Sequence, residues 1–175
     1  LAIELGLRKL GRTWAMDHLK ARPECQWAAA LVVQSMAKPE TLRDMLKILR
    51  PKQCLLAQQV EGDLLRQEGR YAEAAAIFRR AAEAHKDNYG LVLSQAAATQ
   101  WAGGAKNALA LYRRVWEATK DPRAGNNGAY LMTSLYPTDR VALTEAKAWA
   151  EAAAKAAPNI AAFADTRGWV AHLLG

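Results

Sequence analysis

Two stretches of the chain repeat one pattern: EGRYAEAAAIFRRAAEAHKD at residues 68–87 and AGGAKNALALYRRVWEATKD at residues 102–121. A shift of 34 residues places Gly69 on Gly103, and it aligns an aromatic residue, an Arg-Arg pair and a Lys-Asp pair in the same register. Self-similarity at a fixed period of this length is typical of stacked helical repeats. We therefore expect the chain to be organised around this period.

The composition supports a helical fold. Hydrophobic residues make up 51% of the chain but aromatic residues only 7%, and alanine supplies much of the difference. Alanine is the best helix former. No stretch alternates β-branched residues in the way that predicts a strand. The sequence therefore predicts an all-α protein.

On this period, residues 55–88 resemble one tetratricopeptide repeat of the bacterial type, which is a pair of antiparallel helices in 34 residues. The family's small, large, turn, aromatic, small, large and small positions appear in order at Gly62, Leu65, Gly69, Tyr71, Ala74, Phe78 and Ala81. Glu61 and Lys86 depart from the pattern, because leucine and proline are usual there. The resemblance implies a right-handed α-solenoid of antiparallel helix pairs, with a concave groove formed mostly by the first helix of each pair.

The resemblance also predicts the organisation of the chain, as degenerate helical hairpins at 1–54, repeat units at 55–88 and 89–122, a unit with a loop insertion at 123–160, and the first helix of a truncated unit or a capping helix at 161–175. In the third unit the small residues Ala129 and Ala146 are 17 residues apart, against 12 in the first two units. Five residues are therefore inserted, within 135–140. Insertions in solenoids map to loops on one face.

Small and bulky residues alternate as close helix packing requires. Gly62 lets two helix axes approach at the near end of the usual range of about 8–10 Å. Phe78 and Tyr112 are predicted to fill the spaces between units. Gly69 and Gly103 can adopt positive φ at low cost, so we expect them to end a helix and reverse the chain.

The resemblance implies which side chains face the groove, because they lie at fixed offsets on the first helix of each unit. Together they form a mixed polar and aromatic surface, in which aromatic residues and Arg are typical anchors and amides can bond an extended backbone. For Trp101 and Trp169, packing against adjoining helices is an equal alternative. The candidate partner-binding residues are Gln59, Asp63, Arg66, Leu93, Gln100, Trp101, Arg123, Asn126, Tyr130, Asp165, Trp169 and His172.

Some members of the family bind chaperones through a carboxylate clamp of Lys, Asn, Asn, Lys and Arg. Registered on the unit at 55, the clamp positions hold Gln59, Asp63, Ser94, Arg123 and Asn127. Asp63 would repel a carboxylate. We therefore do not expect this specificity.

Patterns for catalysis or metal binding do not emerge from the sequence. His18, His85 and His172 fall in different units, and none has a nucleophile at a telling spacing. Cys25 and Cys54 are far apart and lack the further ligands that zinc needs, so we expect buried free thiols. The chain is predicted not to be an enzyme, and no cofactor is expected.

The net charge of +7 is uneven, since residues 1–54 hold ten Lys and Arg against five Asp and Glu. A solvated helix face explains this better than a nucleic-acid site, because no stripe of aromatic and basic residues accompanies it. No apolar run approaches the roughly 18 residues of a membrane span. The chain starts at Leu1, so we expect the native N-terminus to be missing. The compartment stays open between cytoplasm and periplasm.

Two functions fit these features. The first is a non-enzymatic scaffold that binds a peptide or partner protein in the concave groove. The alternative is an accessory module of bacterial envelope, exopolysaccharide assembly or secretion machinery, in which Trp and Tyr side chains stack on sugar rings. The segments at 126–131 and 165–170 resemble such bacterial proteins.

Overall fold

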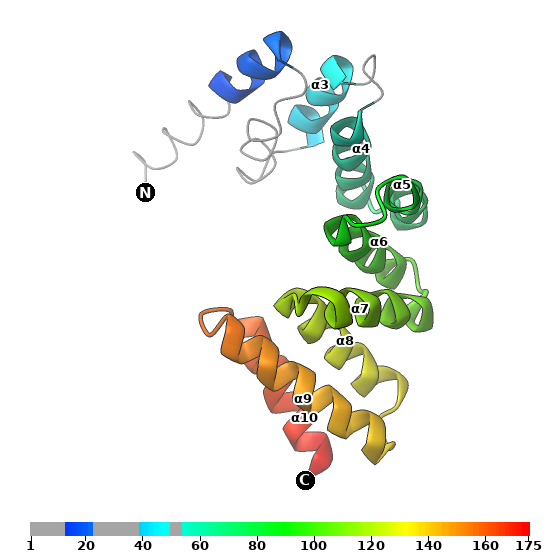
Figure 1. Cartoon of the computed structure of the whole chain (residues 1–175), viewed down its shortest axis with the longest axis vertical. Coiled ribbons are helices and arrows are strands. Elements are labelled where there is room, and N and C mark those ends of the chain that lie inside the picture. Colours follow the sequence, from blue (N-terminus) through cyan, green and yellow to red (C-terminus); the bar gives the residue numbers. More distant parts are fainter. Residues whose placement is uncertain (1–12, 23–38, 50–53) are drawn as a thin grey trace. The chain divides into compact units, whose positions relative to one another are not determined.

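The computed structural model describes residues 13–22, 39–49 and 54–175, and within these ranges it contains helices and no strands (Figure 1). Residues 13–21 are helical. The other helices are α3 (Pro39–Leu49), α4 (Leu55–Gln67), α5 (Tyr71–Ala84), α6 (Tyr89–Trp101), α7 (Ala105–Thr119), α8 (Pro122–Leu135), α9 (Arg140–Ala156) and α10 (Ala161–Leu174). The chain divides into two compact units, residues 1–81 and 82–175, and each is described by itself.

The helices recur on the period that the sequence predicts. Leu55 begins α4 and Tyr89 begins α6, while Tyr71 begins α5 and Ala105 begins α7, so both helices of the pair return after 34 residues. The prediction of an all-α chain is confirmed for the described residues. Neighbouring helices pack in series within each unit.

The two predicted turn glycines end their helices in the same way. The φ angle is +76° at Gly69 and +88° at Gly103. After α4, the N–H of Arg70 donates to the carbonyl of Leu65 at 2.9 Å and that of Gly69 to Arg66 at 3.1 Å. The matching bonds follow α6. Both turns are Schellman motifs, in which glycine avoids the cost of a β-carbon at positive φ.

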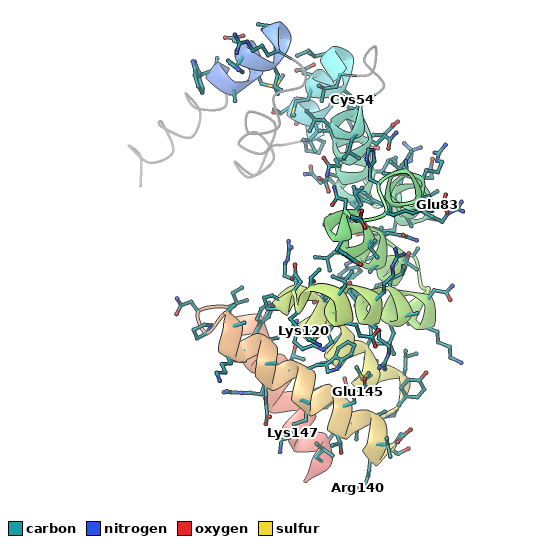
Figure 2. The ribbon with its side chains drawn as sticks, viewed as in Figure 1. Cys54, Glu83, Lys120, Arg140, Glu145 and Lys147 are labelled. Carbon is teal, nitrogen blue, oxygen red and sulfur yellow. The ribbon has the colours of Figure 1, made fainter. Side chains whose placement is uncertain are left out.

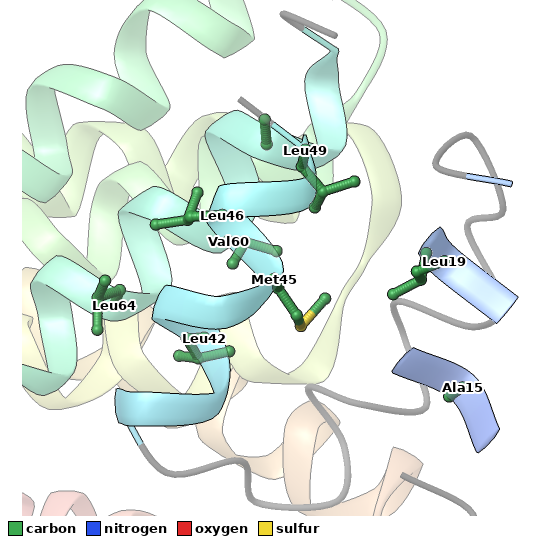
Figure 3. Packing of buried hydrophobic residues seen from close by; sticks show 9 residues of the cluster. Ala15, Leu19, Leu42, Met45, Leu46, Leu49, Val60 and Leu64 are labelled. Atoms are coloured by element: carbon green, nitrogen blue, oxygen red, sulfur yellow. The ribbon is translucent and has the colours of Figure 1, made fainter. Parts of the chain in front are cut away.

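The core of residues 1–81 lies between the helix at 13–21, α3 and α4 (Figure 3). Leu42, Leu46 and Leu49 are all buried on α3. Cys54 precedes α4, is half-buried and is a free thiol (Figure 2). The thiol of Cys25 lies outside the described residues, as do residues 1–12 and 23–38 of the predicted degenerate hairpins.

Close packing joins α4 to α5. A β-carbon built on Gly62 would lie 2.5 Å from Cζ of Phe78, whose side chain is 1% exposed. The ring therefore rests directly on the backbone of α4. This is the small-against-bulky contact that the sequence predicts.

In residues 82–175, two glycines on α8 receive aromatic rings from both neighbouring helices. A β-carbon on Gly125 would lie 2.7 Å from Trp116 of α7, and one on Gly128 would lie 2.6 Å from Trp149 of α9. The two indole rings contact each other, with centroids 5.5 Å apart. Gly128 directly precedes Ala129, the small contact that the sequence singled out, and Ala129 is fully buried.

The five additional residues of the third pair lengthen helices more than the turn. Ala74 and Ala108 are the fourth residues of α5 and α7, whereas Ala146 is the seventh residue of α9. One further residue extends α8, and the turn at 136–139 has four residues where the earlier turns have three. Asp139 caps α9 by accepting bonds from two backbone N–H groups, which fixes where the longer helix begins.

The last helix packs on α9 and α8 through a narrow apolar face. Phe163, Thr166 and Val170 of α10 are buried, and Phe163 joins a small cluster with Ala153 and Ala154. Arg140, labelled in Figure 2, donates to the carbonyl of Leu174 at 3.3 Å. Among the described helices, none is both long and apolar enough to span a bilayer.

Candidate binding surface

A network of polar side chains joins α6, α7 and α8. The Tyr112 hydroxyl of α7 donates to Oε1 of Gln100 at 2.9 Å and accepts from Nδ2 of Asn127 at 3.3 Å. Nδ2 of Asn126 in turn donates to Oδ1 of Asn127 at 3.2 Å. Tyr112 has 0% exposure, and its hydroxyl bonds one side chain on each of the two flanking helices. We name these four residues the amide–phenol network.

Asn126 is the member of this network that lacks one hydrogen-bond partner. Its side chain is 7% exposed, and its Oδ1 has no hydrogen-bond partner among the described residues. A buried acceptor without a donor costs about 1–3 kcal/mol. The network is therefore polar, largely desolvated and one donor short.

Exposed aromatic side chains lie on α6 and α8, two of the helices that the network joins. Trp101 at the end of α6 is 68% exposed, and Tyr130 on α8 is 49% exposed. One side of α8 carries exposed residues at helical spacing. They are Arg123, Tyr130 and Ser134. This side of α8 and the end of α6 form the candidate binding surface.

The positive charge of Arg123 is balanced within its own turn. Its Nη2 lies 2.6 Å from Oδ2 of Asp121, and its backbone N–H bonds to the same carboxylate. The side-chain hydrogen bond from Arg123 lowers the pKa of Asp121, which caps α8. To a binding partner, Arg123 therefore offers hydrogen-bond donors and little net charge.

Three predicted residues lie on α4 and belong to the other unit. Arg66 donates to Oδ1 of Asp63 at 3.0 Å. Burial raises the pKa of Asp63, and the nearby charge of Arg66 partly opposes this. Gln59, also on α4, is half-buried. These residues form a small polar cluster that is distinct from the network.

The remaining predicted residues are placed apart from the network or offer little surface. Leu93 on α6 is 7% exposed, so it presents almost nothing to a partner. Asp165, Trp169 and His172 are exposed on α10, where the rings of Trp169 and His172 lie 5.5 Å apart. The structure thus brings together Gln100 and Asn126 of the predicted set, with Trp101 and Tyr130 on the same helices.

Sequence reasoning missed the polar role of Tyr112 and Asn127. The repeat register identified Tyr112 only as a bulky core residue, and the rejected clamp had already placed Asn127 on the groove. A buried tyrosine usually finds a partner for its hydroxyl. Applied to Tyr112, that rule predicts a polar partner for the hydroxyl.

A second cluster that the sequence did not predict links α7 to α9. Arg113 bonds both carboxylate oxygens of Glu145, and the Nη2–Oε2 distance is 2.9 Å. Its guanidinium also lies over the Trp149 ring, 5.2 Å from the centroid. Lys120 lies over Trp116 in a similar way. These contacts fasten the two helices and cover the indole pair.

One hollow of about 350 Å³ lies among α3, α4 and α5. Half of its lining is aliphatic, from Leu46, Leu64, Leu65, Ala76 and Ile77. The other half is charged, from Glu61, Glu68, Arg70, Glu73 and Arg80. Glu68 accepts one hydrogen bond from Arg43 at 2.7 Å and a second from Arg70. Arg70 also donates to Glu73. Two carboxylates and two guanidinium groups thus balance one another at the hollow.

Comparison with known proteins adds no family to this picture. No family model matches the chain, and no curated protein matches it. Within the described residues, no three His, Cys, Asp or Glu side chains come together as a metal site would require.

Proposed function

We propose that the chain is a non-enzymatic scaffold of the tetratricopeptide-repeat kind. In this proposal its helix pairs form a right-handed solenoid, and an extended segment of a partner protein binds along α6 and α8. Support comes from the 34-residue recurrence of helices, the matching Schellman turns and the glycine-to-ring contacts. A structural unit that recurs at a fixed length and packs on its neighbours is the basis of a stacked-repeat protein.

The observation that carries the binding proposal is the amide–phenol network beside two exposed aromatic residues. Amide side chains can both donate to and accept from a peptide backbone, and Gln100 and Asn127 of the network are only half-buried. Trp101 and Tyr130 supply large apolar surfaces at low entropic cost. Together they favour a ligand with main-chain N–H groups and one or two apolar side chains.

The exposed aromatic side chains also favour a second candidate. Trp101, Tyr130 and Trp169 are half-exposed or more, and such rings can stack on sugars. A polysaccharide would use the aromatic surfaces, whereas the half-buried amides of Gln100 and Asn127 suit amide and hydroxyl groups alike. We rank the peptide first, because the polar network accompanies the aromatic residues only on α6 and α8.

A peptide-display selection on the purified chain, run beside a glycan array, tests both candidates. We expect peptides to be selected and their binding to fall when Trp101→Ala and Tyr130→Ala are combined. Val141→Ala is the matched control, since Val141 is 81% exposed on α9. Peptides that bind the double variant as well as the parent chain would remove this surface from the proposal. Glycan binding lost in the same variant would favour the second candidate.

A further inference from the structure

The three hydrogen bonds of the amide–phenol network all donate in the same direction. Asn126 donates to Asn127 at 3.2 Å, and Asn127 donates to the Tyr112 hydroxyl at 3.3 Å. Tyr112 then donates to Gln100 at 2.9 Å. Donation therefore runs from the buried Asn126 to Gln100, which is half-buried and directly precedes the exposed Trp101.

Every member of this network can exchange the roles of donor and acceptor. An amide has an oxygen that accepts and a nitrogen that donates, and a phenol hydroxyl does both. A half-turn of the last side-chain torsion exchanges the two ends of an amide, and this torsion is roughly two-fold. If the three amides turn and the hydroxyl hydrogen of Tyr112 rotates, the same three contacts form with donation running from Gln100 to Asn126.

The buried end of the network does not decide between the two directions. In the direction described above, Oδ1 of Asn126 is buried and has no hydrogen-bond partner among the described residues. In the reversed direction Oδ1 accepts from Asn127, and Nδ2 takes the buried position without a partner. One buried polar group is thus left unpaired in either case. The difference lies at Gln100, which keeps its Nε2 hydrogens for a ligand in one direction and its Oε1 in the other.

We propose that the amide–phenol network reverses its direction of donation, and that Gln100 thereby matches either hydrogen-bonding group of a bound peptide backbone. A main-chain carbonyl beside Gln100 accepts from Nε2 and stabilises the described direction. A main-chain N–H donates to Oε1 and stabilises the reversed direction. A ligand shifts the two states by this difference in affinity. The inference rests on the proposed peptide surface for its ligand, but the reversal itself belongs to the free chain.

Two substitutions of Gln100 hold the free chain in opposite directions at neutral pH. The carboxylate of Gln100→Glu only accepts, so Tyr112 donates to it. The ammonium group of Gln100→Lys only donates, so Tyr112 accepts from it and donates to Asn127. Nuclear magnetic resonance of the Asn126 side-chain amide reports the result. Its hydrogen bond to Asn127 is lost in Gln100→Lys, so the bonded hydrogen should shift upfield of its position in Gln100→Glu.

The Tyr112→Phe background is the first control, because its ring has no hydroxyl to transmit the change. There the same pair of substitutions brings the same charges, and most of the shift difference at Asn126 should disappear. The second control keeps the network intact and places Glu or Lys at Gln95, which is half-buried earlier on α6. These variants should leave Asn126 unshifted. Equal Asn126 shifts with and without the Tyr112 hydroxyl overturn the reversal, as do identical shifts in Gln100→Glu and Gln100→Lys.

Uncharged peptides from the display selection test the role of Gln100 in binding. Each peptide should lose affinity in one of the two Gln100 variants and keep it in the other, according to the group that it presents. Equal affinity for both variants would remove this role. The result is separate from that of the surface itself: peptides that bind regardless of Trp101 and Tyr130 remove the surface and leave the reversal measured in the free chain.

Discussion

The ring of Phe78 lies so close to Gly62 that a β-carbon there would be 2.5 Å from Cζ and 2.7 Å from Cε2. Phe78 is 1% exposed and cannot turn aside into solvent. Gly62→Ala should therefore lower the free energy of unfolding by about 1–3 kcal/mol through overpacking. Denaturant unfolding followed by circular dichroism measures the loss.

Gly168→Ala provides the control for this prediction, since the chemical change is the same but the site is open. Without a clash, alanine should stabilise α10 by up to about 1 kcal/mol. Opposite signs for the two substitutions are expected. If Gly62→Ala were also stabilising, the contact between α4 and α5 would not be as close as described.

The hydroxyl of Tyr112 should contribute measurably to the free energy of unfolding. Tyr112→Phe keeps the ring but leaves Oε1 of Gln100 and Nδ2 of Asn127 without their partner. We expect a loss of about 1–2 kcal/mol in unfolding free energy. Tyr130→Phe removes the same group from a half-exposed ring and should change stability by less than about 0.5 kcal/mol. Equal effects of the two changes would argue against the network.

The Arg113–Glu145 pair should couple α7 to α9 measurably. In a double-mutant cycle with Arg113→Met and Glu145→Gln, we expect a coupling of about 0.5–1 kcal/mol, because both side chains are more than one-third exposed and solvent screens them. The exposed Lys147–Glu151 pair, at 4.0 Å, should give less. A coupling that does not weaken in high salt would show that packing on Trp149, and not charge, joins the helices.

Asp63 predicts an unusual dependence of stability on pH. Burial raises its pKa in the folded chain above the ordinary value of 3.8, so the folded state binds the proton more tightly than the unfolded state. Stability then falls as pH rises from 3.8 through the raised pKa. Asp63→Asn should be more stable than the parent at neutral pH and gain nothing below pH 3.8. Thermal melts across pH test this.

Asp121→Asn should behave in the opposite sense. The hydrogen bond from Arg123 lowers the pKa of Asp121, so the carboxylate contributes stability above 3.8 that is lost as pH falls through the lowered pKa. Asparagine is an equally good helix cap, so the variant isolates the charge. It should be less stable than the parent at neutral pH. The same sign for both variants would contradict the two assignments.

The repeat period predicted the helices and their turns because both depend on local chemistry. Gly69 and Gly103 end helices through their own backbone conformation, and alanine-rich stretches between them favour helix wherever they occur. These features need no knowledge of the neighbouring helix. The positions of α4 to α7 followed directly.

The candidate surface could be predicted only in part. Helical spacing places Arg123 and Tyr130 on one side of α8, but the bond between Tyr112 and Asn127 depends on how far α7 slides along α8. The contact between the two indole rings could not be predicted either, because Trp116 and Trp149 occupy positions that the 34-residue register does not mark. Contacts of this kind are decided by side-chain packing between helices, which periodicity does not encode.

The contact between Trp116 and Trp149 gives residues 82–175 an optical signature of their own. Two indole rings held 5.5 Å apart at a fixed tilt of 35° couple their electronic transitions and produce a split circular-dichroism band in the ultraviolet. That band vanishes once α7 and α9 separate, whatever happens in residues 1–81. The chain thus carries a built-in chromophore for following the melting of one half apart from the other.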